Sequence, residues 1–199
     1  MRQKALLAVV ALVAVLLIGA PTAFATNLLT NGSFQNGNLS GWNTSCGLCE
    51  VTSGSFYAYS GGQDGDGFYV IMGDVGSDGT FSQTFSDTAG AHYTFSFWFA
   101  SVGDNPSDFS AYWDGGTALL SLTNPNTGAT WSEYSYSVTG TGSDTISFNE
   151  RDAPAYMALD NVSVSPSGGT TPEPSSLLLL GSGLLTVGGV IRKKLQANR

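Results

Sequence analysis

An alternating run of aromatic residues in the middle of the chain limits the possible folds more than any other feature of the sequence. In the segment Tyr93–Phe99, four aromatic side chains occupy every second position, and threonine and serine fill two of the positions between them. Side chains at every second position of a β-strand lie on the same face. The segment therefore predicts a strand whose aromatic face lies in a hydrophobic core, with Trp98 interrupting the polar face.

Seven further segments have the composition of short β-strands, and clusters of Gly, Asn, Asp and Pro separate them. No long stretch between the two chain ends has the period of an amphipathic helix. This pattern indicates an all-β fold, an antiparallel β-sandwich. The further predicted strands are Phe68–Met72, Thr80–Phe85, Phe109–Trp113, Ala118–Thr123, Ser132–Val138, Asp144–Phe148 and Tyr156–Val164.

The beginning of the chain has the pattern of a secretory signal peptide. Two basic residues precede an unbroken apolar run that ends at Ile18. Ala23 and Ala25 then supply the small residues of a signal peptidase cleavage site. We therefore expect residues 1–25 to form a signal helix that is removed on export, so that the mature chain begins at Thr26.

The end of the chain has three parts in sequence. They are the motif Pro172, Glu173 and Pro174, the uncharged apolar segment 177–191, and the basic tail 192–199 with Arg192, Lys193 and Lys194. An apolar helix of this length spans a bilayer only marginally, because about 20 residues are needed to cross the hydrocarbon core. The positive-inside rule places the basic tail in the cytoplasm, so the preceding domain lies on the outer side.

This order of Pro-Glu-Pro motif, short hydrophobic helix and basic end resembles the PEP-CTERM sorting signal of Gram-negative bacteria. The resemblance implies transient anchoring in the inner membrane, recognition by an exosortase and cleavage near the motif. Release to the cell surface or an extracellular matrix would follow. The same tail is also called an ice-binding protein C-terminal domain, a label that concerns the tail. Residues 166–171 are expected to form a flexible linker to it.

Between the two terminal signals the chain is strongly acidic. Residues 26–171 contain 14 of the 15 acidic and one of the seven basic residues, which gives a formal charge of −13 against −8 for the whole chain. Such a surface repels nucleic acid and attracts cations, of which calcium is common outside cells. Residues 26–165 are long enough for one domain with its own core.

Cys46 and Cys49 are the only cysteines. In an exported protein this spacing favours a local disulfide between them. A thioredoxin-type redox pair would need a helix after the second cysteine, and the residues that follow Cys49 do not favour one. The two cysteines and the single histidine, His92, are too few for a structural zinc site.

Several motifs resemble, in order, those of galactose-binding-like jelly-roll domains. They are Asn27–Phe34 with Gly41 and Trp42, then Phe81–Phe85, then Tyr93–Trp98, and finally Ala158–Val164. The resemblance covers most of the acidic domain and implies a jelly-roll sandwich. Many carbohydrate-binding modules share this fold, but the fold alone does not define the function.

Asp160 is the most informative single residue. It is in phase with the two valines that follow it, so we expect its carboxylate in the interior, where it needs a partner. In the resembling modules a structural calcium ion joins the first and last strands, which implies Asp160, Asn31 and Gln35 as calcium ligands. Gln35 stands where those modules commonly have an acidic residue. The alternatives are an ion pair with Arg151, hydrogen bonds to main-chain amides, or an exposed Asp160.

Sugar binding would need exposed aromatic rings for stacking against pyranose rings. Trp113 and Trp131 are the candidates, because one ends a strand before a turn and the other lies close to two tyrosines. Trp42 and Trp98 match the family pattern and are expected in the core. A carbohydrate-binding module for exopolysaccharide is therefore one alternative function.

The leading interpretation is a non-catalytic, exosortase-sorted protein of the cell surface or extracellular matrix. An ice-binding protein would need a flat, regular, Thr-rich face, and no repeat supplies one. A glycoside hydrolase would need two facing carboxylates in a cleft, and the sequence places no two together. A nucleophile motif with Asp and His partners is also missing, so no enzyme is expected.

Overall fold

The computed structural model describes residues 26–63, 67–152 and 154–167. Thr26–Gly168 form one compact unit. The predicted signal helix, the transmembrane helix 177–191 and the Pro-Glu-Pro motif with its basic tail lie outside the described residues. Within the described ranges, no helix is long and apolar enough to cross a membrane.

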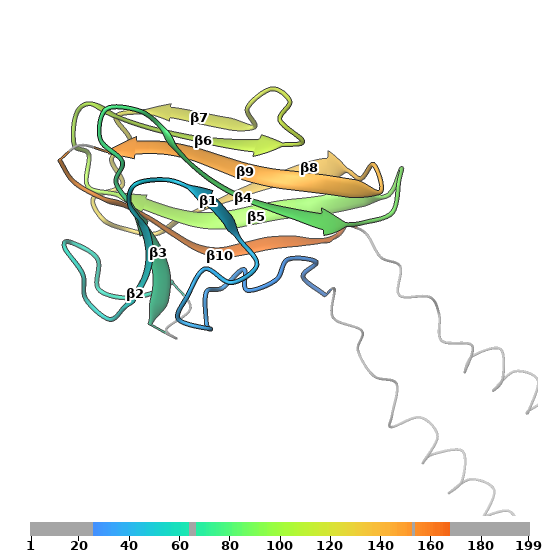
Figure 1. The fold of residues 1–199 in the computed structure, drawn as a ribbon, viewed down its shortest axis with the longest axis horizontal. Coiled ribbons are helices and arrows are strands. Elements are labelled where there is room, and N and C mark those ends of the chain that lie inside the picture. The colour runs from blue at the N-terminus through green and yellow to red at the C-terminus, as the bar shows by residue number, and fades with distance from the viewer. Residues whose placement is uncertain (1–25, 64–66, 153, 168–199) are drawn as a thin grey trace, which may run out of the picture. The chain divides into compact units, whose positions relative to one another are not determined.

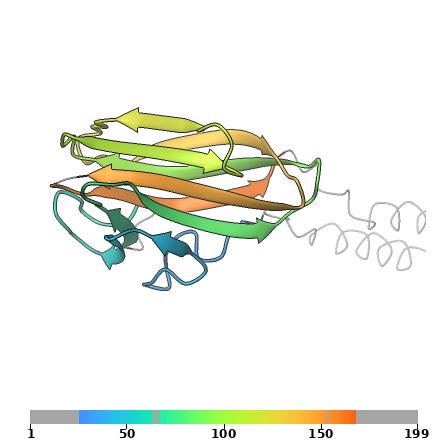
Figure 2. The ribbon, with the colours of Figure 1, turned by 45° about the horizontal axis from the view of Figure 1, so that its top comes forward.

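The described residues form two antiparallel five-stranded sheets, which pack face to face as a jelly-roll sandwich (Figures 1 and 2). The strands are β1 (Asn43–Ser45), β2 (Cys49–Ser53), β3 (Phe68–Met72), β4 (Gly79–Ser86), β5 (His92–Ser101), β6 (Ser107–Trp113), β7 (Leu120–Thr123), β8 (Ser132–Thr139), β9 (Ser143–Asp152) and β10 (Met157–Pro166). The β9 sheet has the order β1-β4-β9-β6-β7, and the β10 sheet has the order β2-β3-β10-β5-β8. The predicted all-β fold is confirmed.

Eight of these strands correspond to the predicted ones, and two were not predicted. The sequence of β1 is entirely polar and exposed, and β2 is short, so neither shows the alternation that marks a half-buried strand. At the other end, β10 continues to Pro166, and the amide of Ser167 donates a hydrogen bond to the carbonyl of His92 at 2.8 Å. Any linker therefore starts later than the predicted residue 166.

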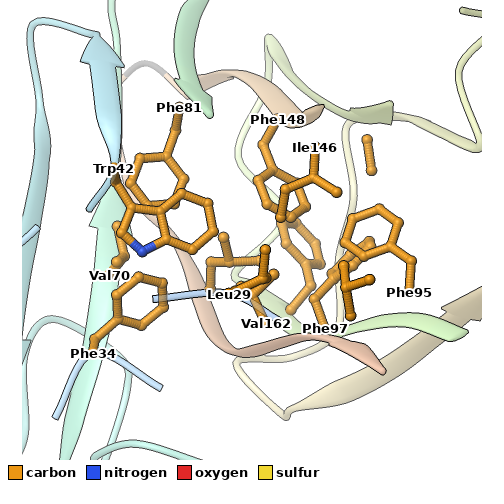
Figure 3. Close-up of a cluster of buried hydrophobic side chains, with 14 of the residues drawn as sticks. Leu29, Phe34, Trp42, Val70, Phe81, Phe95, Phe97, Ile146, Phe148 and Val162 are labelled. Carbon is orange, nitrogen blue, oxygen red and sulfur yellow. The ribbon is translucent and has the colours of Figure 1, made fainter. Parts of the chain in front are cut away.

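The core between the sheets is built largely from aromatic rings, as Figure 3 shows. The β5 rings Phe95, Phe97 and Phe99 are fully buried, which confirms their predicted common face. Phe97 meets Phe148 of β9 edge-on, with ring centroids 5.1 Å apart. Each fully buried ring contributes about 1.5–3 kcal/mol relative to an exposed one. This packing fixes the two sheets against each other. Their outer faces lie away from this core.

The segment before β1 closes one edge of the core. Trp42 stacks on Phe81 with ring centroids 4.1 Å apart, which confirms its predicted core position. Gly32 accepts a hydrogen bond on its carbonyl from the amide of Val162 at 2.9 Å. A Cβ added at Gly32 would lie 2.1 Å from the carbonyl oxygen of Val162. Only glycine allows this close approach of the N-terminal segment to β10.

Candidate functional site

A bulge in β10 determines which way Asp160 faces. The pairing of β10 with β5 shifts register between Asp160 and Ser163, and Asn161 has a φ of 47°. Asp160 lies directly opposite Trp98, and opposite residues of an antiparallel pair share a face. Trp98 alternates with the buried phenylalanines of β5, so both residues lie on the outer face of the β10 sheet. The prediction that Asp160 points into the core with the following valines was wrong, because a bulge resets the two-residue period.

Asp160 is nevertheless fully buried, because the connection between β2 and β3 covers it. Its Oδ2 accepts a hydrogen bond from the Gln63 amide at 2.6 Å, and its Oδ1 accepts one from the Asn161 amide at 2.7 Å. Arg151 pairs instead with Asp108 at 2.5 Å. The predicted ion pair with Arg151 and the predicted exposure were therefore wrong, and the carboxylate bonds to main-chain amides. Calcium at Asp160 stays a prediction.

The other two predicted calcium ligands lie in the turn before β1. The Asn31 side chain donates a hydrogen bond to the carbonyl of Asn38 at 2.7 Å and accepts one from the amide of Asn36 at 3.3 Å. Gln35 is exposed. No hydrogen bond described for Asn31 reaches Asp160. Among the residues that the structure describes, no group of three or more His, Cys, Asp or Glu side chains is arranged to hold a metal ion.

Trp98 is the tryptophan that the outer face presents among polar side chains. It is partly exposed and lies opposite the exposed Glu133 of β8. In the adjacent row of the same face, Ser96 of β5 lies between Ser135 of β8 and Ser163 of β10. The prediction that Trp98 belongs to the core was wrong. Its position between two core phenylalanines already indicated the opposite face.

A group of aromatic rings covers one end of the same outer face. Tyr59 from the β2–β3 connection is buried against Tyr69 of β3 and against Trp131. Trp131 is partly exposed and donates from Nε1 to the Gly61 carbonyl at 3.2 Å. Tyr57 is 61% exposed. The predicted ligand residue Trp131 is thus anchored on one side and accessible on the other.

Trp113 faces the opposite way. It packs between the sheets, 5.6 Å from the ring of Phe85 and 6.2 Å from that of Phe95. Its Nε1 is buried and has no hydrogen-bond partner within the described ranges. Trp113 therefore packs against the core with part of its ring still exposed, and a stacking platform at Trp113 stays a prediction.

The disulfide loop lies beside two buried acidic residues, Asp74 and Glu150. Cys46 and Cys49, the predicted pair, are bonded with their Cα atoms 5.9 Å apart. The carboxylate of Asp74 accepts hydrogen bonds from two amides of this loop at 2.9 and 2.6 Å, and the Asp74 amide donates to Glu150 Oε2 at 3.2 Å. Burial, with the nearby charges of Asp74 and Asp152, raises the pKa of Glu150 to about 8.

A hollow of about 390 Å³ lies beside this loop. Its lining residues are Gly47, Leu48, Gly73, Asp74, Val75 and Ser77. None of these is aromatic, so the hollow lacks a stacking surface for a sugar. Glu150 is fully buried, whereas the acid of a glycosidase must face its substrate in a cleft. Asp74 binds two main-chain amides of the loop, and Glu150 accepts a hydrogen bond from the amide of Asp74.

The outer face of the β9 sheet carries small hydroxyl side chains. Thr84 of β4 and Thr145 of β9 are hydrogen-bonded at 2.8 Å, and Ser82 lies opposite Ser147 in the next row. This hydroxyl-rich face was not predicted, because its residues are separated in sequence and come together only through strand pairing. Paired strands twist relative to each other, so such a face is not flat. Ice binding, which requires a flat and regular face, stays a prediction from the sequence.

The C-terminal region matches a known family. The family described as the PEP-CTERM protein-sorting motif matches residues 170–193. The chain thus carries a PEP-CTERM sorting motif, as the sequence pattern predicted, and this motif implies export and sorting by an exosortase. A comparison with curated proteins finds no significant match.

The sandwich is similar to several carbohydrate-binding modules of known structure. The TmCBM61 module in complex with β-1,4-galactotriose has a TM-score of 0.56 and 18% identity, and the match covers 72% of this chain and 100% of that one. The CBM22-1 xylan-binding domain of Xyn10C from Paenibacillus barcinonensis has a TM-score of 0.50 and 18% identity, over 74% and 97% of the two chains. A cleaved adhesin domain of Lys-gingipain from Porphyromonas gingivalis has a TM-score of 0.52 and 17% identity, over 68% and 96%. At these identities the similarity shows the jelly-roll fold alone.

Proposed function

We propose that this protein is exported, is sorted by an exosortase to the cell surface or extracellular matrix, and there binds polysaccharide through the outer face of the β10 sheet. Signal peptidase and the exosortase are its partners during export. The observation that carries the binding proposal is the position of Trp98, a partly exposed indole that faces outward among small hydroxyl side chains. No catalytic step is part of the proposal.

The outer face combines the two kinds of group that recognise a sugar. An indole ring offers an apolar surface on which the face of a pyranose can stack. The serines in the row next to Trp98 and the carboxylate of Glu133 can hydrogen-bond sugar hydroxyls. Trp131 and Tyr57 extend the aromatic surface at the end of the sheet covered by the β2–β3 connection. A glycan chain of several residues could therefore contact more than one ring.

Charge and fold narrow the class of polysaccharide. The formal charge of −13 on residues 26–171 repels acidic polymers and favours neutral ones. One of the similar modules is described in complex with the neutral trisaccharide β-1,4-galactotriose, and another is described as a xylan-binding domain. We therefore take neutral β-1,4-linked glycans as the first ligands to test.

A glycan array followed by titration of the exported, mature protein tests the proposal. Binding to neutral β-linked glycans is expected, and Trp98→Ala should weaken it at least tenfold, because truncation of a buried aromatic contact typically costs about 2 kcal/mol or more. Tyr112→Ala is the matched control, since Tyr112 is also partly exposed but lies on the outer face of the β9 sheet. Equal affinity of the native protein and Trp98→Ala, or loss of binding only in Tyr112→Ala, contradicts the proposed face.

A further inference from the structure

The inner face of β9 ends in a buried carboxylate that the proposed sugar-binding face does not use. Asp152 is the last residue of β9 and has no exposed surface. Neither of its carboxylate oxygens has a hydrogen-bond partner among the described residues. A buried polar group without a partner is costly, and a buried charge without a counter-charge is more so. This position therefore calls for a ligand or a proton.

The side chains around Asp152 supply further negative charge and no positive one. Burial and the charge of Asp104 raise the pKa of Asp152 to about 6. The hydroxyl of Tyr59 donates a hydrogen bond to the carbonyl of Tyr156, which lies in the connection from β9 to β10, and burial followed by the charge of Asp152, with a smaller effect of Asp104, raises the pKa of that hydroxyl. Arg151 is the only Lys or Arg in residues 26–167, and it binds Asp108 on the other face of β9. No Lys or Arg within the described ranges is left to neutralise Asp152.

The loop that holds Asp104 is fixed by its own hydrogen bonds. The carbonyl of Asp104 accepts a hydrogen bond from Ser107 Oγ at 2.6 Å, and Ser107 lies directly opposite Asp152 in the pairing of β6 with β9. Ser107 also exchanges two hydrogen bonds with Asn124, through its amide to Oδ1 and through its carbonyl to the Asn124 amide, at 2.9 and 2.8 Å. Asp104 is thereby held close to the end of β9 in the absence of any ligand.

We propose that Asp152 and Asp104 bind a divalent cation of the calcium type at the junction of β9 with the β5–β6 connection. Calcium takes six to eight oxygen ligands, which include carboxylates, main-chain carbonyls and water, so carbonyls and water would have to complete the coordination around the two carboxylates. The cation would satisfy both orphaned oxygens of Asp152 and offset the local negative charge. The site is separate from Asp160, which lies on the outer face of the other sheet.

The test measures cation binding by the exported protein after dialysis against a chelator. Titration with calcium by calorimetry, and with terbium by luminescence excited through Tyr59 and its neighbours, should reveal a site. Asp152→Asn and Asp104→Asn should each weaken binding at this site at least tenfold. Asp78→Asn is the matched control, because it removes one acidic charge from an exposed position of the β3–β4 connection. It should bind calcium like the native protein.

The other outcomes separate this site from the alternatives. Loss of calcium binding only in Asp160→Asn would assign the ion to the site predicted from the sequence and overturn the proposal. No calcium response in the native protein, together with an unchanged melting temperature in Asp152→Asn, would mean that Asp152 is simply protonated. If Asp152→Asn does not fold, Asp104→Asn decides the matter, because Asp104 is partly exposed and outside the core.

Discussion

At the scale of single residues, the side chains of three aspartates interact with one another near the start of β9. They are Asp87, Asp114 and Asp144. Burial and contact with Asp144 raise the pKa of Asp87, and the same two causes raise the pKa of Asp114. Burial acts to raise the pKa of Asp144 as well, but its hydrogen bonds to Asp114, Asp87 and Thr141 lower it overall. Asp144 therefore keeps its charge, while Asp87 and Asp114 are less favourably ionised than in the unfolded chain.

Asp87→Asn should stabilise the protein at neutral pH. A folded-state pKa above the unfolded value of 3.8 means that stability falls as pH rises from that value through the raised pKa. Asparagine does not titrate and can donate to the Asp144 carboxylate, so the variant avoids this loss. Melting temperatures measured from acidic to neutral pH should show a gain for Asp87→Asn that grows with pH. Asp78→Asn, at an exposed site, should show none, and a gain independent of pH would contradict the explanation.

The faces of individual residues show where sequence reasoning succeeds and fails. The four-ring pattern in β5 was sufficient to place Phe95 and Phe97 in the core, because strict alternation survives in a regular strand. The same alternation places Trp98 outside, whereas the family pattern places it in the core. Asp160 was misplaced because the bulge at Asn161 adds a residue to β10, and only the tolerance of asparagine for positive φ hints at it. The orphaned Asp152 had no sequence signal, since its burial depends on β6 and the β5–β6 connection.

At the scale of elements, the N-terminal segment and β10 hold each other in place. Gly32→Ala should destabilise the protein by about 1–3 kcal/mol, because the new Cβ would collide with the Val162 carbonyl and separate the two segments. Gly116→Ala is the matched control, since its nearest contact would be an ordinary 3.4 Å to the Trp113 carbonyl. Chemical denaturation measures both variants. Equal midpoints for Gly32→Ala and the native protein would show that this segment does not contribute to stability.

The disulfide loop shows how a short element depends on distant ones. The loop between Cys46 and Cys49 is so short that cross-linking it should stabilise the fold by less than the ~3 kcal/mol expected for a 15-residue loop. Asp74 of the β3–β4 connection holds the same loop, and Glu150 of β9 in turn accepts a hydrogen bond from the Asp74 amide. The sequence identified the cysteine pair, because two cysteines in an exported chain leave few alternatives. It could not identify the two carboxylates, which strand pairing brings together.

At the scale of the whole molecule, processing would change the charge of the protein. Six of its seven basic residues lie before Thr26 or after Pro174, and Arg151 is the exception. Removal of both ends therefore leaves a strongly acidic sandwich that no longer has a basic tail for anionic membranes. Such a molecule suits a neutral polymer and dissolved cations as ligands. The sorting motif implies that this acidic domain is exported.

Mass spectrometry of the exported protein tests this processing. The mature chain is expected to begin at Thr26, because Ala23 and Ala25 precede the cleavage site, and to lack every peptide from residues 192–199. Replacing Pro172, Glu173 and Pro174 together by alanine should retain the C-terminal peptides and leave the protein in the membrane fraction, since the matched sorting motif includes these residues. A matched replacement of Ser165 and Ser167, which precede the motif, should be processed normally. Intact basic tails on native protein at the cell surface would refute exosortase processing, whatever the sandwich binds.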